Sequence, residues 1–162
     1  MKYTLKFSIL WVSLILFSAC SVKEYQLSTP KIIILKTPQI KFADTGYIRK
    51  DANSVQIELY SSGQPVKRIE INTLVCVDDE GCIRKSSFNR EYLNENYSDD
   101  LLLHVALGEK IFDGKNFILT DDGFEQHIKN SDYNITYRVN KQEIYFKDRL
   151  NHILIRFKTI LP

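Results

Sequence analysis

The sequence contains few of the residues that most often carry out chemistry. Its 162 residues include three histidines, three cysteines and one tryptophan. The histidines (His104, His127 and His152) are dispersed, and none has an acid or a nucleophile at the spacing of a catalytic group. Adjacent pairs of aspartates lack the spaced ligands of a calcium loop. From these absences we expect a protein that is not an enzyme and that holds no metal ion and no cofactor.

An excess of charge of either sign is also absent. The formal net charge is +2 at pH 7, and 22 basic residues are interspersed with 20 acidic ones. A protein that binds nucleic acid, or that is held at an anionic membrane by charge alone, carries a basic surplus. The composition therefore predicts no nucleic-acid partner.

Long hydrophobic runs are absent except at the N-terminus. There the apolar run from Phe7 to Phe17 follows Lys2 and Lys6, which is the pattern of a signal peptide. A helix of this length spans about 17 Å, well short of the ~30 Å hydrocarbon core of a bilayer. The run predicts an export signal and not a transmembrane helix.

The run ends in Phe17-Ser18-Ala19-Cys20, which resembles the lipobox of bacterial lipoproteins, with Phe17 where leucine is usual. The resemblance implies cleavage after Ala19 and a diacylglyceryl group on Cys20, with further acylation by a chain such as palmitate. Two or three acyl chains form an effectively permanent anchor. Ser21 does not match the usual inner-membrane retention signal, which implies the outer membrane, and we expect the domain on its periplasmic face. The alternative is an ordinary signal peptide in which Cys20 is incidental.

Three segments differ in composition. Residues 1–19 form the expected signal peptide, and residues 20–30 form a polar, lipidated tether that ends in Pro30. Residues 31–162 are numerous enough for a single domain with its own core.

Most of the last segment has the pattern of short strands. Apolar and polar residues alternate from Val55 to Tyr60 and again from Ile69 to Val75, with a turn at residues 61–65, which predicts an antiparallel hairpin. Gly46 predicts a turn or bulge earlier in the chain. Further strands are expected at Ile32–Leu35, Ile40–Phe42, Phe117–Leu119, Ile135–Val139, Ile144–Phe146 and Ile153–Phe157.

One helix is clearly marked in the middle of the domain. Ser98 can cap it, Leu101–Leu107 supplies an apolar stripe, and Gly108 is a natural stop. About eight strands and one central helix predict a mainly β (α+β) fold. We expect a strongly curved antiparallel sheet or incomplete barrel around the helix, with a β-sandwich as the alternative.

Cys76 and Cys82 are the two cysteines that remain beyond Cys20. In an exported protein, two nearby thiols most simply form a disulfide. A zinc site would need further ligands that do not accompany the pair, and the spacing differs from that of Cys-x-x-Cys redox motifs. We therefore expect a structural disulfide between Cys76 and Cys82.

Asn134 lies in Asp132-Tyr133-Asn134-Ile135-Thr136, which satisfies the N-glycosylation sequon and its longer bacterial form with an upstream acid. The sequon matters only in a host with periplasmic N-glycosylation. The alternative is an ordinary asparagine at the start of a strand.

Several stretches resemble the LolB family of outer-membrane lipoprotein receptors. They are 42–48 (FADTGYI), 101–108 (LLLHVALG), 124–126 (FEQ), 133–137 (YNITY) and 153–157 (ILIRF). The resemblance implies a curved sheet whose concave face binds acyl chains or lipoproteins on their way to the outer membrane. The apolar residues implied to line this cavity are Val55, Ile57, Leu59, Ile69 and Ile71. The alternative for each of them is ordinary packing in the core.

A second hypothesis needs no cavity. In it, the chain is a structural or assembly lipoprotein that binds another envelope protein through a sheet edge or through the Cys76–Cys82 loop. The two hypotheses differ in what they predict between helix and sheet: a sizeable apolar cavity for the first, a filled core for the second.

Overall fold

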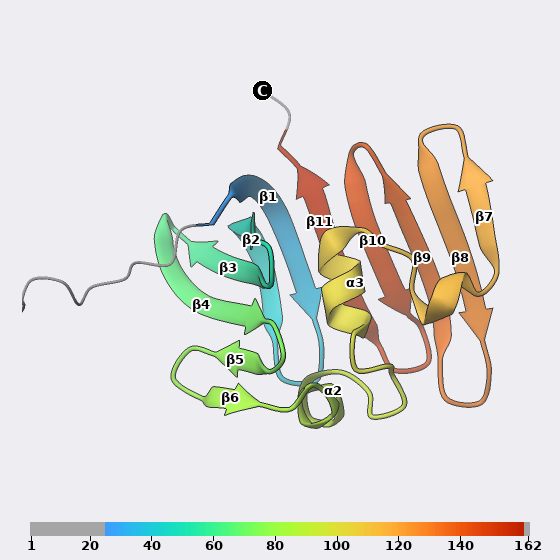
Figure 1. The fold of residues 1–162 in the computed structure, drawn as a ribbon, viewed down its shortest axis with the longest axis horizontal. Helices are drawn as coiled ribbons and strands as arrows, with labels where there is room; N and C mark the ends of the chain where they lie inside the picture. The colour runs from blue at the N-terminus through green and yellow to red at the C-terminus, as the bar shows by residue number, and fades with distance from the viewer. Residues whose placement is uncertain (1–24, 161–162) are drawn as a thin grey trace, which may run out of the picture.

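The computed structural model describes residues 25–160 and contains one antiparallel sheet with two α-helices on one side (Figure 1). The expected signal peptide and Cys20 lie outside the described residues. The strands are β1 (Leu27–Lys36), β2 (Lys41–Lys50), β3 (Val55–Ser61), β4 (Gln64–Ile71), β5 (Val75–Val77), β6 (Gly81–Ile83), β7 (Phe117–Thr120), β8 (Gly123–Lys129), β9 (Asn134–Asn140), β10 (Glu143–Asp148) and β11 (Ile153–Thr159). The helices are α2 (Lys85–Tyr92) and α3 (Leu101–Leu107), followed by the short 3-10 helix η1 (Phe112–Gly114).

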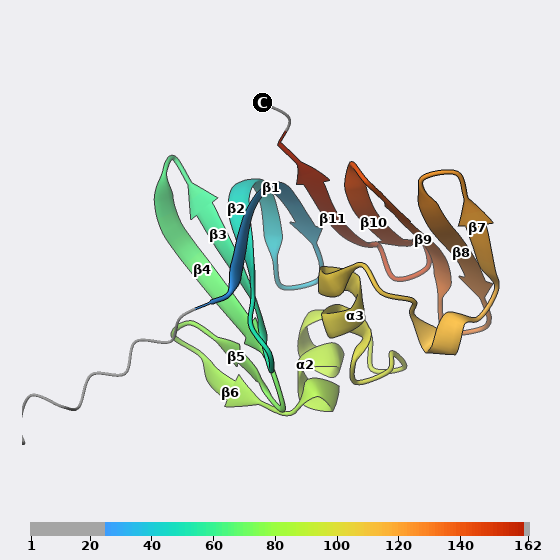
Figure 2. The same cartoon turned by 45° about the horizontal axis from the view of Figure 1, so that its top comes forward.

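The first and last strands lie side by side in the middle of the sheet. The strand order is β6-β5-β4-β3-β2-β1-β11-β10-β9-β8-β7, so each half is a meander that runs outward from the β1–β11 pair. The chain passes from one edge strand, β6, to the other, β7, through α2 and α3, which lie in the hollow of the curved sheet (Figure 2). The edges do not meet. The predicted open, curved sheet is therefore confirmed, and the β-sandwich alternative is wrong because all strands belong to one sheet.

Strand β1 begins at Leu27, earlier than the tether boundary that Pro30 indicated. From Leu27 to Pro30 the strand pairs only with β2, and its pairing with β11 starts at Lys31. Proline is tolerated here because, among the described residues, one side of the strand has no partner that would need its N–H. Residues 27–30 thus belong to the folded domain.

Gly46 lies in the middle of β2 and not at a turn. It pairs with Lys31 on one side and with Leu59 on the other. A Cβ atom at this position would overlap the backbone oxygen of Glu58 and lie 2.6 Å from Cδ1 of Ile33. The glycine is needed because β1, β2 and β3 approach closely on the concave face, a reason that local sequence does not reveal.

The predicted hairpin of β3 and β4 is confirmed, but its second strand is shorter than expected. Strand β4 ends at Ile71, where the Asn72 side chain accepts a 2.9 Å hydrogen bond from the Leu74 N–H and turns the chain. Val75 therefore starts a new strand, β5, which folds back on β4. Cys76 consequently lies within a strand and not at the end of one.

Helix α3 forms where the sequence predicts it, with one difference at its start. Asp100, and not Ser98, is the N-cap residue, and neither side chain caps the helix; the Ser98 carbonyl accepts the Leu101 N–H instead. Gly108 ends the helix with φ 70° and ψ 31°, the left-handed conformation that glycine adopts freely.

Helix α2 was not predicted. Its sequence, KSSFNREY, has only two apolar positions, and no side chain caps its start. Phe88 and Tyr92 lie four residues apart, so their rings share one face, where they stack at 4.6 Å. Both are buried, which shows that packing against the sheet stabilises this helix more than its own propensity does.

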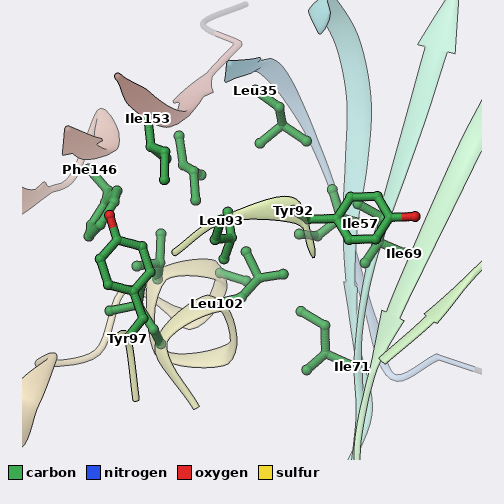
Figure 3. Close-up of a cluster of buried hydrophobic side chains, with 14 of the residues drawn as sticks. Leu35, Ile57, Ile69, Ile71, Tyr92, Leu93, Tyr97, Leu102, Phe146 and Ile153 are labelled. Atoms are coloured by element: carbon green, nitrogen blue, oxygen red, sulfur yellow. The ribbon is translucent and has the colours of Figure 1, made fainter. Parts of the chain in front are cut away.

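The core lies between the helices and the concave face of the sheet. In Figure 3, Tyr92 lies beside Ile57 and Ile69, whereas Tyr97 extends toward Phe146 on the other half of the sheet. The Tyr97 and Phe146 rings meet edge to face at 5.9 Å. Helix α2 and the loop that follows it thus pack against both halves of the sheet.

Candidate functional site

The five residues expected to line an acyl-chain cavity all lie in the core. Each is at most 2 % exposed: Val55, Ile57, Leu59, Ile69 and Ile71. Helices α2 and α3 cover this region and fill it. The apolar cavity that remains, bounded by Ile57, Ile69, Tyr92 and Leu102 among others, measures about 10 Å³. That is room for about one water molecule and not for an acyl chain.

An open cleft lies elsewhere on the concave face, beyond the C-terminal end of α3. We call it the α3-end cleft. Its volume is about 200 Å³, and its lining residues are Leu27, Thr29, Lys31, Ile48, Lys50, Ala106, Leu107, Ile144 and Phe157. They come from β1, β2, β10, β11 and the last turn of α3. Most of them are apolar, so the cleft offers a hydrophobic floor that the helices leave uncovered.

The end of α3 explains why the cleft stays open. Gly108 turns the chain immediately after Leu107, and a Cβ atom at Gly108 would lie 3.1 Å from Cδ1 of Ile144. The helix therefore stops directly above β10. The first residues of β1 line the cleft together with the last turn of α3.

Two lysines give the α3-end cleft a polar side. The Lys31 ammonium donates a 3.0 Å hydrogen bond to the hydroxyl of Thr159 on β11. Partial burial lowers the pKa of Lys31 because it disfavours the charged form. Lys50 lies opposite Leu27 on the neighbouring strand. An apolar floor beside two ammonium groups is suited to a ligand with a hydrophobic part and an anionic head.

Cys76 and Cys82 form the expected disulfide. They lie directly opposite each other on β5 and β6, at one edge of the sheet. The turn between these strands carries the exposed acids Asp78, Asp79 and Glu80. Within residues 25–160, no group of three or more His, Cys, Asp or Glu side chains is arranged to hold a metal ion.

The structure does not bring the three histidines together. His104 is on α3, with a buried Nδ1 that has no hydrogen-bond partner among the described residues. His127 lies on β8, 3.6 Å from a carboxylate oxygen of Glu125. His152 lies in the turn between β10 and β11 with a positive φ of 56°.

Asn134 is the first residue of β9. Its N–H donates a 3.0 Å hydrogen bond to Oδ1 of Asp148, and its carbonyl accepts one from the N–H of Arg149. Its backbone is thus tied to the β10–β11 turn on both sides.

Asp148 is the polar residue that sequence reasoning missed. Its side chain is fully buried and accepts hydrogen bonds from the Tyr97 hydroxyl, from the N–H groups of Asn134 and Leu150, and from the side-chain amide of Asn151. Burial alone would raise its pKa, but these hydrogen bonds outweigh burial and lower the pKa below 3.8. The sequence marks only a polar turn here, because the partner Tyr97 is 51 positions away.

A second buried polar side chain fixes the chain between α3 and β7. Gln126 is fully buried; its Oε1 accepts the Ile111 N–H, and its Nε2 donates to the carbonyls of Ile111 and Lys115. It gives the loop the hydrogen bonds that a neighbouring strand would otherwise provide.

Comparison with known proteins adds no family to these observations. Among residues 25–160, no helix is both long enough and apolar enough to cross a membrane. No protein-family model, no curated protein and no solved structure matches this chain.

Proposed function

We propose that the chain is a lipid-anchored protein of the bacterial outer membrane that binds an acyl chain of an amphiphile in the α3-end cleft, a different place from the one that its resemblance to the LolB family implied, which is a filled core. The observation that supports this function best is the cleft itself. Its floor is apolar (Ile48, Leu107, Ile144, Phe157), and Lys31 and Lys50 lie beside that floor.

The size of the cleft restricts what it binds. At about 200 Å³ it is smaller than typical small-molecule sites of ~300–1,000 Å³, and somewhat larger than the ~150 Å³ cavity that holds one benzene. It therefore accepts part of one acyl chain and not several chains at once. The hydrophobic effect supplies the binding free energy, and no covalent bond is made or broken.

The position of the cleft also favours an amphiphile as ligand. Leu27, which lines it, follows Cys20 by seven residues, and a fully extended segment of that length reaches at most about 25 Å. A domain anchored through Cys20 would thus hold this cleft close to the membrane surface. Acyl chains that leave or enter a bilayer are available there.

A displacement assay tests the proposal on a soluble protein that begins at residue 21. A fluorescent fatty acid should bind with enhanced emission and be displaced by palmitate. Ile48→Asp and Leu107→Asp place a charge on the cleft floor and should weaken binding at least about tenfold. Leu119→Asp introduces the same charge at a side chain that is 77 % exposed on β7, and it should bind like the wild type. Equal affinity in all four proteins would exclude the α3-end cleft as the site.

The anchor is tested separately. Cys20→Ala and treatment with globomycin should each block maturation and release the domain from the membrane fraction. A Cys20→Ala protein that still sediments with the outer membrane would refute the lipid anchor, whatever the displacement assay shows.

A second candidate function is supported by edge strand β7. Ile118 and Leu119 on this strand are 51 % and 77 % exposed, and no described strand pairs with its outer side. An exposed apolar edge can pair with an extended strand of another envelope protein. A photo-crosslinking residue at position 119 should then form a discrete adduct in cells, and a Thr120→Pro change should abolish it.

A further inference from the structure

A second hollow lies at the far end of β1 from the α3-end cleft. Its volume is about 370 Å³, and its lining residues are Lys36, Lys147, Asp148, Arg149, His152, Ile153 and Leu154. We call it the basic hollow. On strand β1, Lys36 lines the basic hollow and Lys31 lines the α3-end cleft, so the two sites are five positions, or about 17 Å, apart along the strand. The two sites share no lining residue.

Strand register places two lysines on the same face of the sheet. Lys36 on β1 and Lys147 on β10 are both cross-strand partners of Leu154 on the intervening β11. Strands that are two positions apart lie about 10 Å from each other. The long side chains of the two lysines can therefore reach one ligand seated over Leu154.

The β10–β11 turn brings Arg149 and His152 to the hollow. Asp148 accepts hydrogen bonds from the N–H of Leu150 at 2.9 Å and from the Asn151 side chain at 2.6 Å, which fix the turn. His152 ends the turn with φ 56°, a conformation in which glycine or asparagine is more usual. His152 thus adopts an unusual backbone conformation, and its imidazole lines the same hollow as Lys36 and Lys147.

Among the described residues, no ion pair neutralises the positive charge of the hollow. Elsewhere in the described chain, Arg49, Lys67, Arg68, Lys85 and Arg156 form ion pairs with carboxylates. Within residues 25–160, no carboxylate lies within ion-pair distance of Lys36, Lys147 or Arg149. The single acid of the lining, Asp148, is buried and already accepts hydrogen bonds at both oxygens.

We propose that the basic hollow binds the phosphate group of a phosphomonoester ligand. Lys36 and Lys147 supply ammonium groups, Arg149 supplies a guanidinium that can bind two phosphate oxygens at once, and His152 supplies a further N–H donor. A phosphomonoester carries close to two negative charges at neutral pH. Lys36, Lys147 and Arg149 carry three positive charges and Asp148 carries one negative charge, so the charge of the ligand matches the net charge of the hollow. The hollow is larger than one phosphate, and its volume lies within the range of small-molecule sites, so the organic part of the ligand packs against Leu154.

The same phosphate chemistry occurs in a soluble sugar phosphate and in a lipid headgroup, and the experiment separates them. The soluble protein from residue 21 is titrated calorimetrically with glucose 6-phosphate and with glucose. Sedimentation with phosphatidylcholine vesicles is measured with and without phosphatidic acid. We expect saturable binding of glucose 6-phosphate, of phosphatidic acid vesicles, or of both, and no binding of glucose or of pure phosphatidylcholine.

Variants identify the site. Lys36→Gln combined with Lys147→Gln, and separately Arg149→Gln, should each weaken the observed binding about tenfold or more, because each removes a charge-assisted hydrogen bond. Arg149→Lys keeps the positive charge but cannot form a bidentate hydrogen bond, so its affinity should lie between those of the wild type and Arg149→Gln. The matched control is Lys158→Gln, an exposed lysine on β11 that lies outside the hollow.

Thermal melting of each variant shows whether it is folded, and these exposed or half-buried side chains should be replaceable without loss of the fold. The proposal is overturned if neither phosphate probe binds, if glucose binds as well as its phosphate, or if the Lys36/Lys147 and Arg149 variants bind like Lys158→Gln. None of these results bears on the displacement assay at the α3-end cleft.

Discussion

The Tyr97 hydroxyl donates a 2.6 Å hydrogen bond to Oδ2 of Asp148, a residue 51 positions later in the chain. Both groups are buried, and burial together with the Asp148 carboxylate raises the pKa of Tyr97 far above its ordinary value. Tyr97 lies between α2 and α3, and Asp148 ends β10. One carboxylate thus connects the helices to the β10–β11 turn and, through the Asn134 N–H, to the start of β9.

Replacing this carboxylate should destabilise the whole domain. In Asp148→Ala, the buried Tyr97 hydroxyl and the N–H groups of Asn134, Leu150 and Asn151 lose their acceptor, which should cost about 3 kcal/mol or more in the free energy of unfolding. Asp122→Ala removes an exposed aspartate and should change stability by about 0.5 kcal/mol or less. Urea denaturation of both variants measures the difference, and an Asp148→Ala protein as stable as Asp122→Ala would contradict the role of Asp148.

The same group predicts a dependence of stability on pH. Because the folded pKa of Asp148 lies below its ordinary value of 3.8, the unfolded chain binds more protons than the folded chain as the solution becomes acidic. The stabilisation is complete above about pH 5 and decreases as the pH falls through the folded pKa. Asp148→Asn should flatten this part of the stability curve. If the free energy of unfolding of Asp148→Asn fell between about pH 5 and pH 2 as steeply as that of the wild type, other carboxylates would cause the acid sensitivity.

The fold was predictable where its signals are local. The alternation of β3 and β4, the Leu-rich α3 with its terminal Gly108, and the Cys76–Cys82 pair are each encoded within a few consecutive residues. Helix α2 has no such signal, because Phe88 and Tyr92 are held by strands that come from other parts of the sequence.

The candidate sites were less predictable because they, too, depend on contacts between distant parts of the sequence. The apolar alternation of Ile57 and Ile69 correctly indicates burial, but it does not reveal that α2 and α3 fill the space beside them. The α3-end cleft depends on where α3 stops relative to β10, and the basic hollow depends on the register of β1, β11 and β10. Neither geometry is contained in any one segment of sequence.

The close approach at Gly46 predicts that even a methyl group is not tolerated there. Gly46→Ala would force the new Cβ against the Glu58 carbonyl and Cδ1 of Ile33, and overpacking of this kind costs about 1–3 kcal/mol. The neighbouring Thr45→Ala is exposed on the same strand and should be nearly neutral. Chemical denaturation of both proteins provides the measurement, and equal midpoints would show that the sheet adjusts without penalty.

The disulfide should contribute modestly to stability. Its partners are separated by 6 positions, and closing so short a loop restricts the unfolded chain by about 2 kcal/mol. The Cys76→Ser/Cys82→Ser double variant should lose about this much, and dithiothreitol should destabilise the wild type but not the variant. If the reductant destabilised both proteins equally, its effect would not come from this disulfide.

The pairing of β1 with β11 has a consequence for the order of folding. Lys31 and Thr159 are 128 positions apart, yet they meet at the centre of the sheet. Contacts of such high sequence separation form late because the loop they close carries the largest entropy loss. While the chain is being synthesised, its two meanders cannot join until β11 is available. The central strand pair, and with it the complete sheet, therefore forms only after almost the whole domain has been synthesised.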